Sequence, residues 1–217
     1  MSRRFPKNPQ VPAVKLTAGP EYVISYGGPL WRIHSLEGLH PSAWNELRHY
    51  GPVSRFRWEP HPPPAQVHTN AAVMYAAAHC TTAFAEVFQD DHAITLTNDR
   101  ALTAWLPTRP LRLLNLCSSD WALHHGASAS LPHAAKNICR SWAKHIFEQL
   151  SWPERSTLDG LYTPSTKTGD PVIVLFPRAE GSLPARPAYS RTLNHEATVQ
   201  MATAAADRLR WRLQQAP

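Results

Sequence analysis

Residues 160–176 read GLYTPSTKTGDPVIVLF, in which two strand-like runs flank a polar segment. The first run is Gly160-Leu161-Tyr162-Thr163, and the second is Val172-Ile173-Val174-Leu175-Phe176, which is rich in β-branched residues. The polar residues from Thr166 to Asp170 include a glycine and are typical of a turn. This stretch therefore predicts a β-hairpin.

Other segments also have the alternation or the apolar character of β-strands. They are Leu30–Ile33, Val53–Trp58, Ala71–Ala77, Ala93–Thr97 and Leu111–Leu116. In a strand over Val53–Trp58, alternation would place Phe56 and Trp58 on one face and Arg55 and Arg57 on the other. We therefore expect this strand to have a buried side and a cationic side.

Helical periodicity occupies much of the remaining sequence. After Thr81-Thr82, which can cap a helix, Phe84, Val87 and Phe88 form an apolar stripe, and Glu86 lies off its centre. The other predicted helices are Pro41–Leu47 with Ser42 as its cap, Leu102–Leu106, an amphipathic helix from Pro132 through Ile146, and a final helix over about residues 194–214. Together the elements predict a single domain of the α+β (mixed α/β) class.

The composition fits one globular domain of 217 residues, with 43% hydrophobic and 18% charged residues. We expect an N-terminal arm over residues 1–20 and a domain over residues 21–217. No apolar run is long enough to span a bilayer, and the basic N-terminus has no apolar stretch after it. The expected location is therefore cytoplasmic, without a membrane partner.

The formal net charge of +6 would suit an acidic protein partner or an anionic small substrate. The arginines are dispersed and form no basic block with interleaved aromatics, so we expect no direct nucleic-acid binding. Cys80, Cys117 and Cys139 are widely spaced in apolar surroundings, and we interpret them as small buried hydrophobic residues. The sequence leaves homo-oligomer formation open.

Several familiar catalytic motifs are missing from the sequence. It has no P-loop, no G-x-G-x-x-G after a strand and no G-x-S-x-G turn. Its 12 histidines form no zinc-ligand pattern, and Asp90-Asp91-His92 is better explained as a solvated turn. We therefore expect no bound metal.

The polar residues that packing leaves unexplained occur in an order that resembles a known family. The segments that carry it are Trp31-Arg32-Ile33, Ser54-Arg55-Phe56, Met74-Tyr75-Ala76-Ala77, Thr82-Ala83-Phe84-Ala85-Glu86-Val87-Phe88, Asp159-Gly160-Leu161-Tyr162-Thr163-Pro164-Ser165 and Val174-Leu175-Phe176. In this order they resemble the successive blocks of the RES domain family, which is named for its arginine, glutamate and serine. The resemblance extends over about residues 28–178.

This resemblance implies a central sheet flanked by helices, related to that of ADP-ribosyltransferases. It implies a toxin that cleaves NAD at the nicotinamide–ribose bond by hydrolysis or phosphorolysis, with NAD as the substrate and no cofactor. Transfer of ADP-ribose to a protein is an alternative, and a non-catalytic NAD-binding module of the same fold is another. The partner that the family implies is an antitoxin of the helix-turn-helix Xre type.

Five residues match family positions, and the chemistry of NAD cleavage suits their types. Arg55, with Arg32 at a further basic position, would bind the pyrophosphate through a guanidinium fork. The Glu86 carboxylate would stabilise an oxocarbenium-like cation or activate the attacking water. The resemblance implies that Arg55 and Ser165 complete the catalytic set. Tyr75 would stack on the nicotinamide, and Ser165 would hold the ribose or the amide.

Structural explanations compete with each of these roles. Tyr75 fits a core position, and Arg55 could simply pair with Glu59 or Glu86. Ser165 could serve only to shape the turn after Pro164. The sequence alone leaves these alternatives open.

The chain also departs from the family pattern in two places. The stretch Glu59–Asn70 contains several prolines and histidines and is longer than the connection we expect in the family. Ser54 stands where a glycine usually precedes the family arginine. We therefore expect the rim of the site to differ here from that of the relatives.

Overall fold

The structure is a computed structural model that describes residues 6–151 and 158–216. Its strands are β1 (Val23–Tyr26), β2 (Leu30–Ser35), β3 (Tyr50–Gly51), β4 (Gln66–Val67), β5 (Met74–Ala77), β6 (Ala93–Leu96), β7 (Arg100–Trp105), β8 (Leu111–Asn115), β9 (Gly160–Pro164), β10 (Pro171–Leu175), β11 (Tyr189–Thr192) and β12 (Arg212–Gln215). Its α-helices are α1 (Cys80–Phe88), α2 (Trp121–His124), α3 (Lys136–Ile146) and α4 (Glu196–Leu209). Short helical turns occupy Pro20–Tyr22, Leu131–His133, Phe147–Ser151 and Pro177–Ser182. The predicted mixture of helices and strands in one α+β domain is confirmed.

Within the described residues, eight strands form one mixed sheet in the order β1-β8-β9-β10-β5-β2-β7-β11. Its neighbours are antiparallel except for β8 and β9, which run parallel. The predicted hairpin is confirmed as β9–β10, in which Val172 pairs with Thr163 and Leu175 with Gly160. Gly160 allows close pairing, because a Cβ there would lie 1.9 Å from the carbonyl oxygen of Val174.

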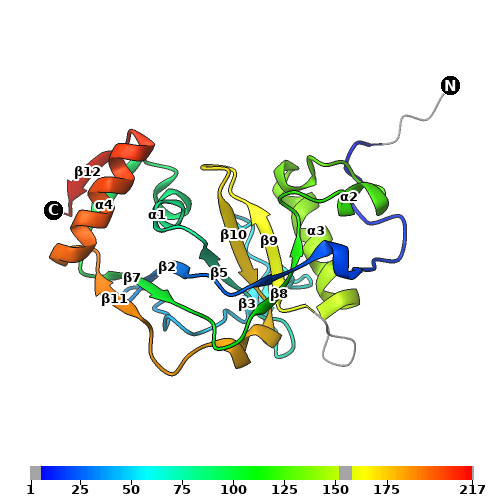
Figure 1. Cartoon of the computed structure of the whole chain (residues 1–217), viewed down its shortest axis with the longest axis horizontal. Coiled ribbons are helices and arrows are strands. Elements are labelled where there is room, and N and C mark those ends of the chain that lie inside the picture. The colour runs from blue at the N-terminus through cyan, green and yellow to red at the C-terminus, as the bar shows by residue number, and fades with distance from the viewer. Residues whose placement is uncertain (1–5, 152–157, 217) are drawn as a thin grey trace.

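The helices gather on one face of this sheet in two groups. Figure 1 shows α1 and α4 over one half and α2 and α3 over the other, with the β9–β10 hairpin between them. Each group has its own apolar cluster, one centred on Phe84 and Leu102 and the other on Trp121 and Trp142. The opposite face carries a third cluster around Met74, which is covered by connecting segments. The helix-covered face of the sheet is therefore divided between two apolar clusters.

The segment Val53–Trp58 is irregular, so the predicted strand there is wrong. Its backbone polar groups find partners other than a neighbouring strand. The carbonyl oxygens of Ser54 and Phe56 accept from the side chain of Arg140 on α3 at 2.7 and 3.3 Å, and the Phe56 N–H donates to Val53. The alternation of apolar and cationic residues in this segment therefore does not correspond to a β-strand.

Two predicted helices are also absent at their expected places. Leu102–Leu106 largely coincides with β7, whose apolar run reflects burial on both faces, and such short runs do not distinguish strand from helix. Pro41–Leu47 forms turns, because several of its carbonyl oxygens accept from the Arg32 guanidinium instead of from helical N–H groups.

The C-terminal helix is shorter than predicted, because α4 ends at Leu209. Arg210 adopts a left-handed conformation with φ of 56°, and the Trp211 N–H donates back to the Ala206 carbonyl, as in a Schellman motif. The Trp211 ring then stacks on His92 at 5.1 Å. These contacts turn the chain into β12, which pairs parallel with β6.

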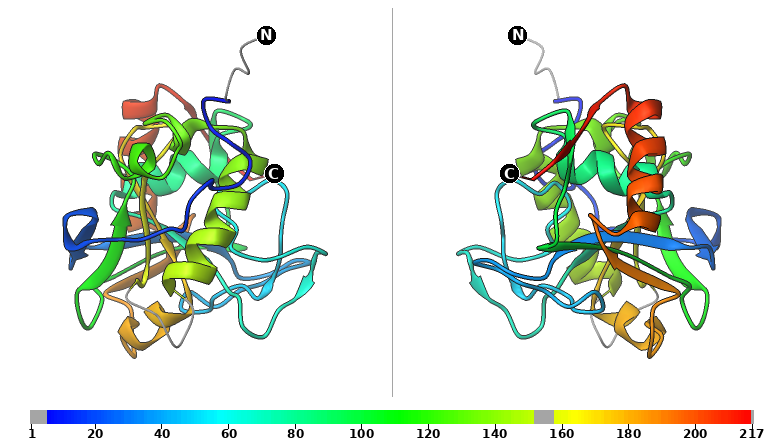
Figure 2. Two further views of the ribbon diagram at one scale, coloured as in Figure 1. Left: turned by 90° about the vertical axis from the view of Figure 1, so that its right-hand side faces the viewer. Right: turned by 90° about the vertical axis from the view of Figure 1, so that its left-hand side faces the viewer.

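The described part of the predicted N-terminal arm packs against the α2–α3 side of the domain. Leu16 is 1% exposed within the same cluster as Trp142. The Trp142 indole N–H donates to the Pro9 carbonyl, and that of Trp121 donates to the Thr17 carbonyl. Figure 2 shows this segment running beside α3. Residues 1–5 of the predicted arm lie outside the described residues.

No helix in the described ranges has the length and apolar character needed to cross a membrane.

Candidate active site

The structure joins two of the predicted site residues, Glu86 and Ser165. Glu86 lies on α1 and Ser165 directly follows β9, and the Ser165 hydroxyl donates to Glu86 Oε1 at 2.6 Å. The same hydroxyl oxygen accepts the backbone N–H groups of Lys167 and Thr168 at 3.0 and 3.2 Å. Because two donors occupy its oxygen, the hydroxyl is oriented with its proton toward the carboxylate.

The Glu86 carboxylate keeps much of its hydrogen-bonding capacity free. The residue is only partly buried, whereas Ser165 is 2% exposed. A carboxylate can accept about four hydrogen bonds, and within the described ranges the Glu86 carboxylate accepts the one from Ser165, whereas Gln89 donates to the Glu86 backbone carbonyl. The remaining lone pairs are therefore available to a water molecule or a ligand hydroxyl.

The same turn is tied to the helices at other points. Thr82 Oγ1 on α1 lies 3.0 Å from Thr168 Oγ1 and 3.4 Å from the Asp170 carboxylate. The Asp170 carboxylate also accepts from Arg208 on α4 at 3.2 Å. The hairpin is thus attached to α1 and α4 independently of Ser165. The Glu86–Ser165 bond is therefore not required to hold the turn in place.

Tyr75 on β5 presents a ring that is fixed at both its face and its hydroxyl. The ring stacks on Phe56 with centroids 5.1 Å apart and planes 20° apart. Its hydroxyl group lies 3.0 Å from both the Trp58 carbonyl oxygen and Glu59 Oε1, to which it donates. Burial, together with the charge of Glu59, raises the pKa of Tyr75 well above its usual value. Tyr75 is therefore a neutral hydrogen-bond donor.

Glu59 is the centre of a buried polar network that the sequence did not predict. Its side chain is fully buried and accepts from Arg48, from His61 Nδ1 at 3.1 Å and from the Val53 N–H at 3.2 Å, in addition to Tyr75. Burial alone would raise the pKa of this carboxyl group, but the hydrogen bonds from His61 and Arg48 outweigh burial and lower it. Glu59 is therefore an ionised, fully paired carboxylate.

Arg55 is exposed in a turn and pairs with neither Glu59 nor Glu86, the two partners that the sequence left open. Its guanidinium lies over the Phe56 ring, with Cζ 4.9 Å from the ring centroid. Phe56 also stacks on Tyr75, so the Phe56 ring is the contact that links Arg55 to Tyr75. Glu59 pairs instead with Arg48, which no sequence motif singled out.

The structure does not place Arg32 beside the other predicted site residues. Its neighbour Trp31 pairs with Ala77 and therefore shares a face with Tyr75, so alternation directs Arg32 to the opposite face of the sheet. There its guanidinium donates to the carbonyl oxygens of Trp44 and Glu46 at 3.0 and 3.1 Å among other partners. Burial lowers its pKa to about 10.

Tyr75 and Ser165 lie on the helix-covered face of the sheet. Val174 pairs with both Tyr75 and Leu161, and Thr163 and Ser165 follow Leu161 at two-residue steps, so these five residues face the same side. Tyr75 packs with the α3 cluster, whereas Glu86 lies on the helix of the α1–α4 cluster. We call the set of Arg55, Tyr75, Glu86 and Ser165 the seam site, because it borders both clusters.

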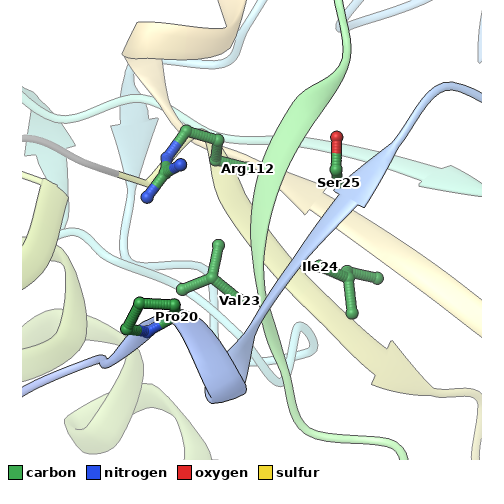
Figure 3. Close-up of a pocket in the computed structure, with 5 residues that line it drawn as sticks. All are labelled: Pro20, Val23, Ile24, Ser25 and Arg112. Atoms are coloured by element: carbon green, nitrogen blue, oxygen red, sulfur yellow. The ribbon is translucent and has the colours of Figure 1, made fainter.

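A separate pocket with a volume of about 190 Å³ lies at the edge strand β1. It is lined by Pro20, Val23, Ile24, Ser25 and Arg112, which Figure 3 shows around the β1–β8 pair. None of these residues belongs to the seam site. The pocket is therefore distinct from the carboxylate–hydroxyl pair of Glu86 and Ser165.

The described residues contain no group of three or more histidine, cysteine or acidic side chains that could hold a metal ion. The cysteines are unpaired, and Cys139 is buried, whereas Cys80 and Cys117 are only partly buried. Burial raises the pKa of Cys80 and Cys117 to about 12. Both groups are therefore neutral thiols.

The fold and the seam site define a single mixed α/β domain in which a large mixed sheet, flanked by helices, carries a carboxylate–hydroxyl pair. The family model described as the RES domain matches residues 29–213, and the chain belongs to this family. The resemblance derived from the sequence is thus confirmed. The match also continues beyond residue 178 through α4.

One solved structure gives a similar fold. A chain of the M. tuberculosis MbcT–MbcA toxin–antitoxin complex matches with a TM-score of 0.54 and 15% sequence identity. The match covers 85% of this chain and 92% of that chain. At this identity the likeness establishes the fold alone. None of the curated proteins compared with the chain matches its sequence.

Proposed function

We propose that the chain is a toxin-type enzyme that cleaves the nicotinamide–ribose bond of NAD at the seam site. The observation that carries this proposal is the 2.6 Å hydrogen bond between Ser165 and Glu86. It provides a carboxylate with spare lone pairs beside a hydroxyl whose direction is fixed. Membership of the RES domain family supports the choice of NAD as substrate.

A negative charge close to the reacting ribose carbon favours cleavage, because positive charge develops on that carbon. The C1′–N bond breaks with its electron pair on the departing nicotinamide, which leaves as a neutral molecule, and an oxocarbenium-like cation develops on the ribose. In our proposal the Glu86 carboxylate stabilises that cation and accepts the proton of the attacking water. The product is then ADP-ribose, or ADP-ribose phosphate when phosphate attacks in place of water.

The remaining residues of the seam site bind and orient the substrate. The exposed guanidinium of Arg55 is suited to the pyrophosphate oxygens, which it can reach in a bidentate geometry. The Tyr75 ring is suited to stack against the nicotinamide. Ser165 is suited to orient the Glu86 carboxylate toward the ribose, because its hydroxyl donates to that carboxylate. Because Arg32 anchors a loop on the opposite face, we assign it to structure instead of to the substrate.

Nicotinamide release is the direct test of this proposal. Purified protein is incubated with NAD, with and without inorganic phosphate, and the products are separated by chromatography. We expect nicotinamide together with ADP-ribose or ADP-ribose phosphate. ADP-ribose on a protein acceptor would instead identify a transferase. NAD binding without release would identify a non-catalytic module, and either result would contradict the proposed reaction.

We also propose that an antitoxin protein of the helix-turn-helix Xre type restrains this activity in the cytoplasm. The fold shared with a chain of a toxin–antitoxin complex supports this proposal. Induced expression of the chain in a bacterial host should arrest growth and lower cellular NAD. A matched culture that expresses Glu86→Gln should grow normally. Equal growth of the two cultures would contradict the toxin assignment.

A further inference from the structure

The Tyr75 hydroxyl and the Glu59 network bound to it take no part in the chemistry proposed for the seam site. The hydroxyl lies 3.0 Å from Glu59 Oε1 and 3.0 Å from the Trp58 carbonyl oxygen. A phenol has one proton to donate, and both of these partners are acceptors. The hydroxyl is thus committed to the protein interior. The ring is the part of Tyr75 that remains to meet a ligand.

Glu59 has three further hydrogen-bond partners besides the Tyr75 hydroxyl. Its side chain is 0% exposed, and an unpaired charge at such a position would be costly. Arg48, His61 and the Val53 N–H pair with the carboxylate and keep it ionised. Gly51 makes room for this arrangement, because a Cβ there would lie 2.4 Å from His61 Nδ1 and 2.8 Å from Glu59 Oε2.

The same network fixes the other aromatic ring. The Arg48 guanidinium lies over Phe56, with Cζ 5.0 Å from the ring centroid, and Arg55 lies 4.9 Å from the same centroid. Phe56 in turn stacks on Tyr75 at 5.1 Å. Arg48 therefore contacts both Glu59, which holds the Tyr75 hydroxyl, and Phe56, which supports the Tyr75 ring. The ion pair between the buried Glu59 and the partly exposed Arg48 therefore contacts Tyr75 at its hydroxyl and supports its ring through Phe56.

We propose that Tyr75 acts in the seam site through its ring alone, and that Glu59 and Arg48 are positioning residues that orient this ring for an aromatic ligand group. This inference rests on the proposed function, because the ligand group is the nicotinamide of NAD. Its consequence is that the tyrosine hydroxyl takes no part in the proton transfers of the reaction. Loss of the hydroxyl should weaken substrate binding without lowering the turnover rate.

The test is a steady-state kinetic comparison of Tyr75→Phe, Tyr75→Ala and Glu59→Gln in the full chain. Tyr75→Phe keeps the ring and should retain the wild-type kcat while KM for NAD rises about 5-fold, as expected for one hydrogen bond. Glu59→Gln should raise KM by a similar factor. The double variant should be no worse than the poorer single variant, because both remove the same contact. Tyr75→Ala should lose at least about 10-fold more in kcat/KM than Tyr75→Phe.

Matched controls separate this role from general stability. Tyr189→Phe removes a tyrosine hydroxyl bonded to Thr198 at 2.6 Å, and Asp159→Asn alters another buried, arginine-paired carboxylate. Both should leave KM unchanged in the folded fraction, which thermal unfolding defines for every variant. Should Glu59→Gln not fold, the comparison of Tyr75→Phe with Tyr75→Ala still decides the role of the ring.

The outcomes distinguish this inference from the proposed function. If the wild-type protein releases no nicotinamide, the proposed function fails, and this inference fails with it. If the wild type is active but Tyr75→Phe loses kcat as completely as Tyr75→Ala, the hydroxyl is needed and only the inference is overturned. Additive effects of Tyr75→Phe and Glu59→Gln on KM would overturn the positioning role of Glu59.

Discussion

An acidic side chain lies beside each end of strand β9, but the two carboxylates are in opposite environments. At the start, Asp159 is fully buried and accepts two bonds of 2.7 Å from Arg109 and one of 2.8 Å from the Arg112 N–H, with Arg178 at 3.3 Å. At the other end, Ser165 donates to a glutamate of α1 that is partly exposed.

The contrast separates a structural carboxylate from one that is available for chemistry. The arginine fork on Asp159 fills its lone pairs and leaves no place for a ligand. Glu86 retains free lone pairs and access to solvent, which a reaction at that carboxylate requires. Both residues belong to the blocks that carry the family resemblance, so sequence similarity alone does not tell their roles apart.

The contrast predicts the largest effect on activity at Glu86. Glu86→Gln keeps the size of the side chain but removes the charge that opposes the ribose cation. We expect nicotinamide release to fall by about 10³-fold. Thermal unfolding should stay close to wild type, because the side chain is partly exposed. Loss of less than tenfold would contradict the catalytic role.

A substitution at Asp159 should instead lower the stability of the protein and leave its activity per folded molecule unchanged. Asp159→Asn replaces an acceptor oxygen by an amide that faces the donors of Arg109 and Arg112. We expect the free energy of unfolding to drop by about 3 kcal/mol, at the low end for a broken buried pair because the arginines can reach solvent. Denaturant unfolding measures this change. Unchanged stability would remove the distinction between the two ends of β9.

The contribution of Asp159 to stability should also depend on pH. Burial would raise its pKa, but the hydrogen bonds from Arg109 and the Arg112 N–H outweigh burial and lower it below the usual 3.8. A lowered folded pKa stabilises the fold above the unfolded pKa, and this stabilisation is lost as pH falls through the folded value. The stability gap between wild type and Asp159→Asn should therefore be full at neutral pH and shrink below about pH 4. A gap that stays constant on acidification would contradict the charge assignment.

A substitution at Arg55 tests whether the substrate-binding site extends from Glu86 to the aromatic rings of Phe56 and Tyr75. Arg55→Ala removes an exposed guanidinium, so stability should not change, whereas KM for NAD should rise about 10- to 30-fold with little effect on kcat. Lysine at this position should restore only part of the binding, because it lacks the planar fork. An unchanged KM in Arg55→Ala would exclude this residue from the pyrophosphate site.

The smallest of these effects is expected at Ser165. Ser165→Ala removes the hydrogen bond to Glu86 and the acceptor of the Lys167 and Thr168 N–H groups, and we expect kcat/KM to fall about 10-fold. The turn should stay folded, because Thr82 and Asp170 hold it independently. If hydrogen exchange showed the turn unfolding in this variant, the serine would be a structural residue.

The sequence predicted the hairpin and the helix of Glu86, because local patterns specify both. It did not predict that Ser165 and Glu86 touch, since 79 positions separate them and only the sheet order brings them together. The Glu59 network was missed for the same reason, although an acidic residue beside the buried Trp58 was a usable signal. Alternation over Val53–Trp58 was misleading, because the side chain of Arg140 on α3 binds carbonyl oxygens of this irregular segment in place of a neighbouring strand.

We propose that Glu86, which Ser165 contacts just after β9, is catalytic, and that Asp159, just before β9, is structural. The most direct measurement compares nicotinamide release from Glu86→Gln and Asp159→Asn, each expressed per folded molecule at saturating NAD. We predict that Asp159→Asn keeps the wild-type rate and that Glu86→Gln is about 10³-fold slower. Equal losses in the two variants, or a normal rate in Glu86→Gln, would contradict the claim.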